Sequence, residues 1–114
     1  MSLLDPREPA KCSKPTYTIN DATRIVKLLH EPLQKVEIAI SIGGSLAYRG
    51  TSTKDADIIL YPYAPGQVLN IDNIVFLLQE LGFYINGLGG SGNFTDVLVA
   101  DYNGMRVDFI ILKR

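Results

Sequence analysis

The sequence predicts a small α+β domain in which helices flank a mixed β-sheet. Two stretches, residues 20–32 and 70–81, repeat apolar side chains with the period of an amphipathic helix. Residues 35–42 alternate in the manner of a strand with one buried face. Asn103 and Gly104 lie between two further alternating runs, and such a pair is the strongest short-range signal of a β-hairpin. Helices and hairpin-linked strands in one short chain indicate the α+β class.

Length and composition limit the chain to one domain. Its 114 residues are 46% hydrophobic, which is enough for a single core and too little for two. Residues 1–18 carry three prolines and scattered charges without a clear period. We therefore expect an N-terminal arm over residues 1–18, loosely packed or disordered, followed by one folded domain over residues 19–114.

Charge and cysteine content argue against several classes of protein. A net charge of −1 disfavours binding to nucleic acid through a broad basic surface, because that mode needs many Lys and Arg side chains at the phosphates. The single cysteine, Cys12, rules out an internal disulfide framework and suits a reducing compartment. No apolar run has the length of a membrane span, and residues 1–15 lack the apolar centre of a signal peptide. We expect a cytoplasmic protein without a membrane partner.

The first predicted elements are a helix and a strand. The helix over residues 20–32 is expected to end at Pro32, and its apolar stripe consists of Ala22, Ile25, Val26 and Leu29. The strand over residues 35–42 places four apolar side chains on one face, namely Val36, Ile38, Ile40 and Ile42.

A glycine turn separates this strand from the next. Gly43, Gly44 and Ser45 break the alternation, and residues 46–49 are expected to form a short helical turn. The second strand covers residues 55–61 and is ended by a proline.

The second half of the domain begins with a helix capped by Asn70 and stopped by Gly82. Its apolar stripe consists of Ile71, Ile74, Val75, Leu78 and Leu81. A short strand is expected at residues 83–85. Residues 87–92 formally match a dinucleotide fingerprint, but a strand rather than a helix follows, so we interpret them as a mobile loop. Strands over residues 96–102 and 105–112 then form the predicted hairpin.

Three aspartates stand out against this apolar background. Asp55 and Asp57 are two residues apart on a strand, so they share one face while the residues between and after them turn toward the core. Asp108 lies in the run M-R-V-D-F-I-I-L, where an unpaired charge would be costly, and strand period places it opposite Val107 and Phe109. A solvated edge strand would explain the first pair alone. The glycine turn upstream and the third aspartate favour a functional site instead.

The chemistry of this set suggests a metal centre for phosphate transfer. Carboxylate oxygens are the ligands that Mg²⁺, or Mn²⁺ in its place, prefers. Two such ions, bridged by Asp55 and Asp57, would activate an attacking hydroxyl and orient the phosphates, with Asp108 on the side of the nucleophile. Backbone N–H groups near Gly44 and the hydroxyl of Ser45 suit the terminal phosphates of a nucleotide. Arg49 either binds a phosphate oxygen or is an ordinary surface arginine.

The motif G-G-S, nine residues, D-A-D, and later V-D-F-I resembles the signature of the DNA polymerase beta-like nucleotidyltransferase superfamily. The resemblance covers residues 19–112, and the three-part motif is more specific than any of its parts. It implies a polymerase beta palm-like fold, with Gly44 and Ser45 at the phosphate-binding position. It also implies that Asp55, Asp57 and Asp108 are the metal ligands. In size the chain is similar to minimal nucleotidyltransferases, and the spacing of its motif is similar to the palm of family X polymerases.

The resemblance implies an ATP-binding or other nucleotide-binding enzyme that transfers a nucleoside monophosphate from a nucleoside triphosphate to a hydroxyl acceptor. The acceptor is a protein or a nucleic acid. The acidic balance of the chain favours a minimal nucleotidyltransferase that works with a helical partner protein over a compact polymerase-like palm that acts on nucleic-acid ends. The alternative is a non-catalytic nucleotide-binding or antitoxin-like regulatory module with the same fold. The chain lacks the further helices with which family members usually hold base and acceptor, so we expect a helical partner protein or a homo-oligomer.

Overall fold

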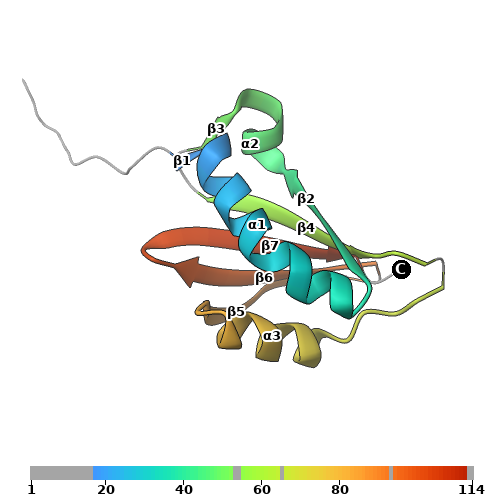
Figure 1. Ribbon diagram of the computed structural model, residues 1–114. Coiled ribbons are helices and arrows are strands. Elements are labelled where there is room, and N and C mark those ends of the chain that lie inside the picture. The colour runs from blue at the N-terminus through green and yellow to red at the C-terminus, as the bar shows by residue number, and fades with distance from the viewer. Residues whose placement is uncertain (1–16, 53–54, 65, 93, 113–114) are drawn as a thin grey trace, which may run out of the picture.

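The computed structural model describes residues 17–52, 55–64, 66–92 and 94–112, and this part of the chain forms three helices and two sheets (Figure 1). The order along the chain is β1 (Tyr17–Thr18), α1 (Ile19–Lys35), β2 (Ile38–Gly43), α2 (Gly44–Arg49), β3 (Thr51–Ser52), β4 (Ala56–Pro62), α3 (Ile71–Glu80), β5 (Tyr84–Ser91), β6 (Thr95–Tyr102) and β7 (Met105–Leu112). The larger sheet has the strand order β2-β4-β7-β6-β5, and β1 pairs with β3 in the smaller one. The predicted α+β class is confirmed.

The central strands carry the register that matters for the site. Strand β4 is antiparallel to β2 and parallel to β7, which makes the sheet mixed. Strands β6 and β7 form the predicted hairpin, and both turn residues have positive φ, 50° at Asn103 and 82° at Gly104. Positive φ at both positions matches the right-handed twist of the two strands, so the sequence signal is confirmed.

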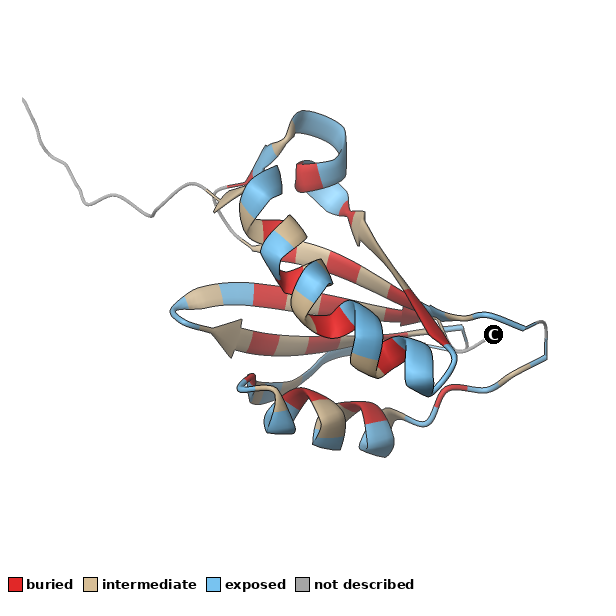
Figure 2. Ribbon diagram, in the orientation of Figure 1, coloured by how far each residue is buried: buried red, intermediate tan, exposed pale blue. Residues whose placement is uncertain are grey.

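The core lies between one face of the larger sheet and helices α1 and α3. Along β4 and β7 the buried residues alternate with half-buried ones (Figure 2). The fully buried side chains of these two strands face the helices and are Ala56, Ile58, Leu60, Val107, Phe109 and Ile111. The intervening residues, Asp57 and Asp108 among them, therefore lie on the opposite face. We call this opposite face the open face.

Helix α1 begins as the sequence indicates and ends later. The Thr18 hydroxyl accepts a hydrogen bond from the Asp21 backbone N–H, and the Asp21 carboxylate accepts one from the Thr18 N–H, which completes a capping box. The prediction that the helix stops at Pro32 is wrong, because it continues through Pro32 to Lys35. Proline removes only one helical hydrogen bond, and the burial of Leu33 in the core anchors the last turn.

Strand β2 begins at Ile38, three residues after its predicted start. The N–H groups of Val36 and Glu37 instead donate to Leu33 and Gln34 at the end of α1, and Glu37 has a φ of 63°. This turn reverses the chain before the strand can begin. Helix α3, capped by the Asn70 side chain, matches its prediction closely.

The glycine-rich stretch is a strand, which corrects the predicted loop over residues 87–92. Strand β5 continues to Ser91 and pairs with β6 through two register shifts, between Ile85 and Gly87 and between Leu88 and Gly90. Glycine permits this close approach, since a Cβ on Gly89 would lie 2.8 Å from a methyl group of Val99. The backbone pairing outweighs the low strand propensity of glycine.

The small sheet of β1 and β3 was not predicted. Tyr17 pairs with Ser52 and Thr18 with Thr51, so the folded part already includes the last two residues assigned to the N-terminal arm. The rest of that predicted arm, residues 1–16, lies outside the described residues. Among the described helices, none combines the length and apolar character needed to cross a membrane.

Candidate metal centre

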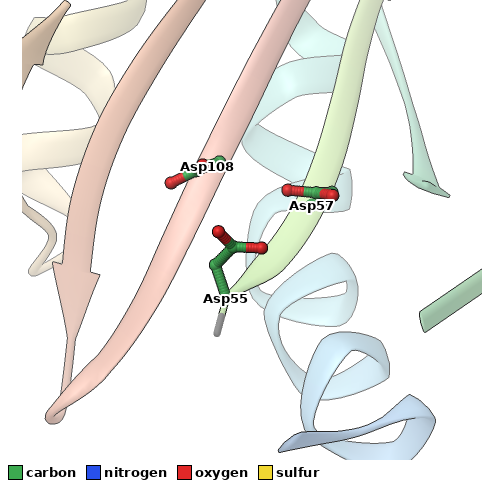
Figure 3. A group of neighbouring side chains, drawn as sticks. All are labelled: Asp55, Asp57 and Asp108. Carbon is green, nitrogen blue, oxygen red and sulfur yellow. The ribbon is translucent and has the colours of Figure 1, made fainter. Parts of the chain in front are cut away.

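Three carboxylates converge at one end of the open face. Each of Asp55, Asp57 and Asp108 offers an oxygen, and these three oxygens lie within 4.8 Å of one another. Figure 3 shows the three side chains close together on the neighbouring strands β4 and β7, with Asp55 just before the start of β4. All three are half-buried. The structure therefore brings together the residues that the sequence marks as metal ligands.

Strand register accounts for this convergence. Asp57 on β4 lies directly beside Asp108 on β7 because the two strands are parallel neighbours. Asp55 comes two residues before Asp57, immediately ahead of β4, and its backbone N–H donates to the Ser52 hydroxyl at 3.4 Å. The backbone around β3 is fixed in turn to the start of α1, where the Ile19 N–H donates to the Gly50 carbonyl at 3.0 Å. These two hydrogen bonds link β3 and the residue before it to Asp55 on one side and to the start of α1 on the other.

Gly44 packs directly against the central carboxylate. It begins α2 and has a φ of +60°, and the residue before it, Gly43, pairs with Asp57 across β2 and β4. A Cβ at Gly44 would overlap Oδ2 of Asp57 and would lie 2.8 Å from its Cγ. Glycine is required here both for the backbone conformation and for the space that the carboxylate occupies.

The other two predicted phosphate ligands, Ser45 and Arg49, lie on α2. Ser45 follows Gly44 at the start of α2 and is exposed. Arg49 is exposed in the last turn of α2. Within the described residues, the ion pairs to the cluster come from Arg106 rather than from Arg49. Tyr48 is also exposed on α2. Tyr61 lies on β4, four residues after Asp57.

Sequence reasoning missed Arg106. Its Nε lies 3.0 Å from Oδ1 of Asp108 and 3.9 Å from Oδ2 of Asp55. Its Nη2 lies 3.4 Å from the second oxygen of Asp108. The same i, i+2 spacing that pairs the aspartates on β4 places Arg106 beside Asp108 on β7, and that spacing was the available signal.

The carboxylates perturb one another. Desolvation, followed by the charges of Asp55 and Asp108, raises the pKa of Asp57 to about 6. Desolvation and the charge of Asp108 also raise the pKa of Asp55. The hydrogen bond and the charge of Asp108 raise the pKa of Arg106, so its guanidinium stays protonated. The cluster therefore carries an excess of negative charge that one arginine offsets only in part.

This donor set fits a hard divalent cation. The three side chains supply oxygen and no soft ligand, and their mutual repulsion is relieved by a cation between them. Gly44 packs against one of these carboxylates, so the start of α2 lies beside the same donor set. No known protein-family model and no curated protein sequence matches this chain.

Proposed function

We propose that the protein is a metal-dependent nucleotidyltransferase, which transfers a nucleoside monophosphate from a nucleoside triphosphate to a hydroxyl acceptor. The observation that carries this proposal is the convergence of three carboxylates from two parallel strands beside Gly44. The resemblance of the G-G-S, D-A-D and V-D-F-I segments to polymerase beta-like enzymes supports it. We include a palm-like fold in the proposal, because the mixed sheet is compatible with one.

The geometry suggests separate roles for the two sides of the cluster. Gly44 and Ser45 lie on the β2 side of Asp57, and there they would bind the terminal phosphates of the triphosphate. Asp108 lies on the opposite, β7 side, so the acceptor hydroxyl would approach there. Asp55 lies immediately before β4 and Asp57 lies on it, so both are between these two sides.

The proposed reaction would use this arrangement in one displacement step. The hydroxyl oxygen forms a bond to the α-phosphorus, the bond from that phosphorus to the pyrophosphate oxygen breaks, and the hydroxyl proton passes to Asp108 or through it to water. Asp55, Asp57 and Asp108 would hold Mg²⁺ or Mn²⁺, which when bound favours ionisation of the hydroxyl and stabilises charge on the leaving pyrophosphate. Half-burial of the carboxylates strengthens their electrostatic effect relative to fully exposed groups.

A non-catalytic nucleotide-binding or regulatory module is the second candidate. The observation that favours it is the ion pairing of Arg106 with Asp55 and Asp108, since this contact partly neutralises the cluster without any metal. Such a module would bind a nucleotide and would transfer nothing.

Incubation with each α-labelled nucleoside triphosphate, Mg²⁺ or Mn²⁺, and protein or nucleic-acid acceptors tests the enzyme. We expect label in an acceptor, with loss of at least about 100-fold in Asp57→Asn, because that change removes a shared metal ligand. Asp72→Asn on α3 is the matched control, since Asp72 is an exposed carboxylate outside the cluster. Nucleotide binding without transfer would favour the module. Transfer retained in Asp57→Asn would contradict the proposed site.

A further inference from the structure

The guanidinium of Arg106 spans two of the three candidate metal ligands. It contacts both oxygens of Asp108, at 3.0 and 3.4 Å, in the forked geometry that arginine forms with a carboxylate. The same Nε reaches Asp55 at 3.9 Å. Arg106 therefore already binds the oxygens that a cation shared between Asp55 and Asp108 would need.

The backbone of Arg106 is held in the sheet, whereas its side chain is half exposed. Arg106 lies in β7, paired with Asp101 of β6, and its backbone N–H donates to the Tyr17 hydroxyl at 3.4 Å. The side chain is 50% exposed, so its head group can leave Asp108 without disturbing the core. A long side chain on a fixed strand can thus alternate between two positions around the same site.

A divalent ion and the guanidinium compete for this place. Two cations that share the oxygens of one carboxylate lie close enough to repel each other strongly in a half-buried site. Asp108 can bind an ion through both oxygens only after Arg106 has left at least one of them. The displaced guanidinium would then lie beside the ion on the β7 side, next to the α-phosphate, which in the proposed reaction lies between the acceptor hydroxyl and the terminal phosphates.

We propose that Arg106 is the internal counter-ion of the metal-free site and a positioning residue for substrate. It leaves Asp108 when a divalent ion binds and then donates to a phosphate oxygen of the nucleoside triphosphate. This inference rests on the proposed function. Its consequence is that metal and nucleotide bind with positive coupling, because nucleotide stabilises the arginine position that metal requires.

Titration of Mn²⁺ followed by calorimetry, with and without a non-hydrolysable nucleoside triphosphate, tests this role in the whole chain. Without nucleotide, Arg106→Gln is expected to bind Mn²⁺ roughly tenfold more tightly than the parent, because a competing charge is gone. With nucleotide, this advantage is expected to disappear or reverse, because the phosphate contact is also gone. Arg24→Gln is the matched control, since Arg24 forms an exposed pair with Asp21 outside the cluster.

A second variant guards against loss of folding. Arg106→Lys keeps the charge and cannot span both oxygens of Asp108, so it is expected to bind Mn²⁺ alone roughly threefold more tightly. Equal or weaker Mn²⁺ binding by the folded variants without nucleotide would overturn the counter-ion role. An advantage that persists with nucleotide would overturn the phosphate contact. Absence of Mn²⁺ binding in the parent and all variants would instead remove the metal centre, and with it the proposed function.

Discussion

Asp57 lies at the centre of the cluster, between the glycine turn of β2 and Asp108 of β7. Its raised pKa, about 6, means that the folded protein binds a proton at this carboxyl more tightly than the unfolded chain does. The stabilisation from this proton is complete below the ordinary value of 3.8 and is lost as the pH rises through about 6. Metal binding has the opposite dependence, because protons compete with the cation.

We expect Asp57→Asn to become progressively more stable than the parent as the pH rises from about 4 to about 7.5 in the absence of metal. The amide carries no charge, so it avoids the repulsion from Asp55 and Asp108 that grows in the parent over this range. Urea unfolding of both proteins in a chelator, across that pH range, measures the difference directly. A difference that stays constant with pH would show that Asp57 does not titrate in this way.

Gly44 provides a second test at the scale of one residue. Gly44→Ala places a non-glycine residue at positive φ, which costs about 1–2 kcal/mol, and it also forces the Asp57 carboxylate to move. Gly50→Ala is the matched control, because Gly50 has a φ of +81° and a Cβ there would meet nothing within 4 Å.

We expect both glycine variants to lose stability through the positive φ, and Gly44→Ala to lose more because the Asp57 carboxylate must also move. Only Gly44→Ala is expected to lose metal affinity, by at least about tenfold. Calorimetric titration with Mn²⁺, combined with urea unfolding, separates the two effects. Equal metal affinity in the two variants would mean that the packing of Gly44 on Asp57 does not position this carboxylate.

At the scale of elements, local signals predicted the structure wherever one residue type dictates the backbone. Asn103 and Gly104 specified the hairpin and Asn70 the start of α3, because each has a conformational or capping role that neighbours do not change. The end of α1 and the extent of β5 were predicted wrongly. At the end of α1, burial of Leu33 outweighs the tendency of proline to end a helix. In β5, pairing with β6 outweighs the low strand propensity of glycine.

Some features of the candidate site could also be predicted from the sequence, and others could not. The face shared by Asp55 and Asp57 follows from strand period, and the β4–β7 register places Asp108 beside Asp57. The reach of Arg106 to Asp55 could not be predicted, because it joins residues from two strands and depends on how far a long side chain extends.

The capping box of α1 connects an element to the site. Thr18 caps the helix and also pairs with Thr51, in the strand that precedes Asp55. Thr18→Ala removes the side-chain cap and is expected to cost about 1 kcal/mol of stability, while backbone pairing with Thr51 remains. Urea unfolding measures this cost.

Thr23→Ala is the matched control for the cap. Thr23 lies within α1, where its exposed hydroxyl donates to the Ile19 carbonyl. Alanine is the better helix former, so this change is expected to be close to neutral. Equal losses in the two variants would show that the cap contributes nothing specific.

On the scale of the whole molecule, helices α1 and α3 and the carboxylates lie on opposite faces of the sheet. Helices α1 and α3 cover the buried face, whereas the open face continues from the carboxylates into half-buried apolar side chains such as Ile59 and Ile110. The expectation of a partner protein or second copy stays a prediction, and light scattering across a concentration series tests it. A strict monomer with transferase activity of its own would contradict it.

Binding at the open face should stabilise the entire domain, because the ligands come from separate strands that meet only in the folded state. With Mn²⁺ and a non-hydrolysable nucleoside triphosphate at about 100 times their dissociation constants, linkage predicts roughly 2.7 kcal/mol for each ligand that binds only the native state. For a domain of this size, each kcal/mol corresponds to roughly 4–8 °C in Tm. Thermal melting should therefore show a large rise in the parent and little or none in Asp57→Asn. An equal rise in that variant would place the bound ions away from the three aspartates, since a carboxamide cannot replace the charge that the shared ligand supplies.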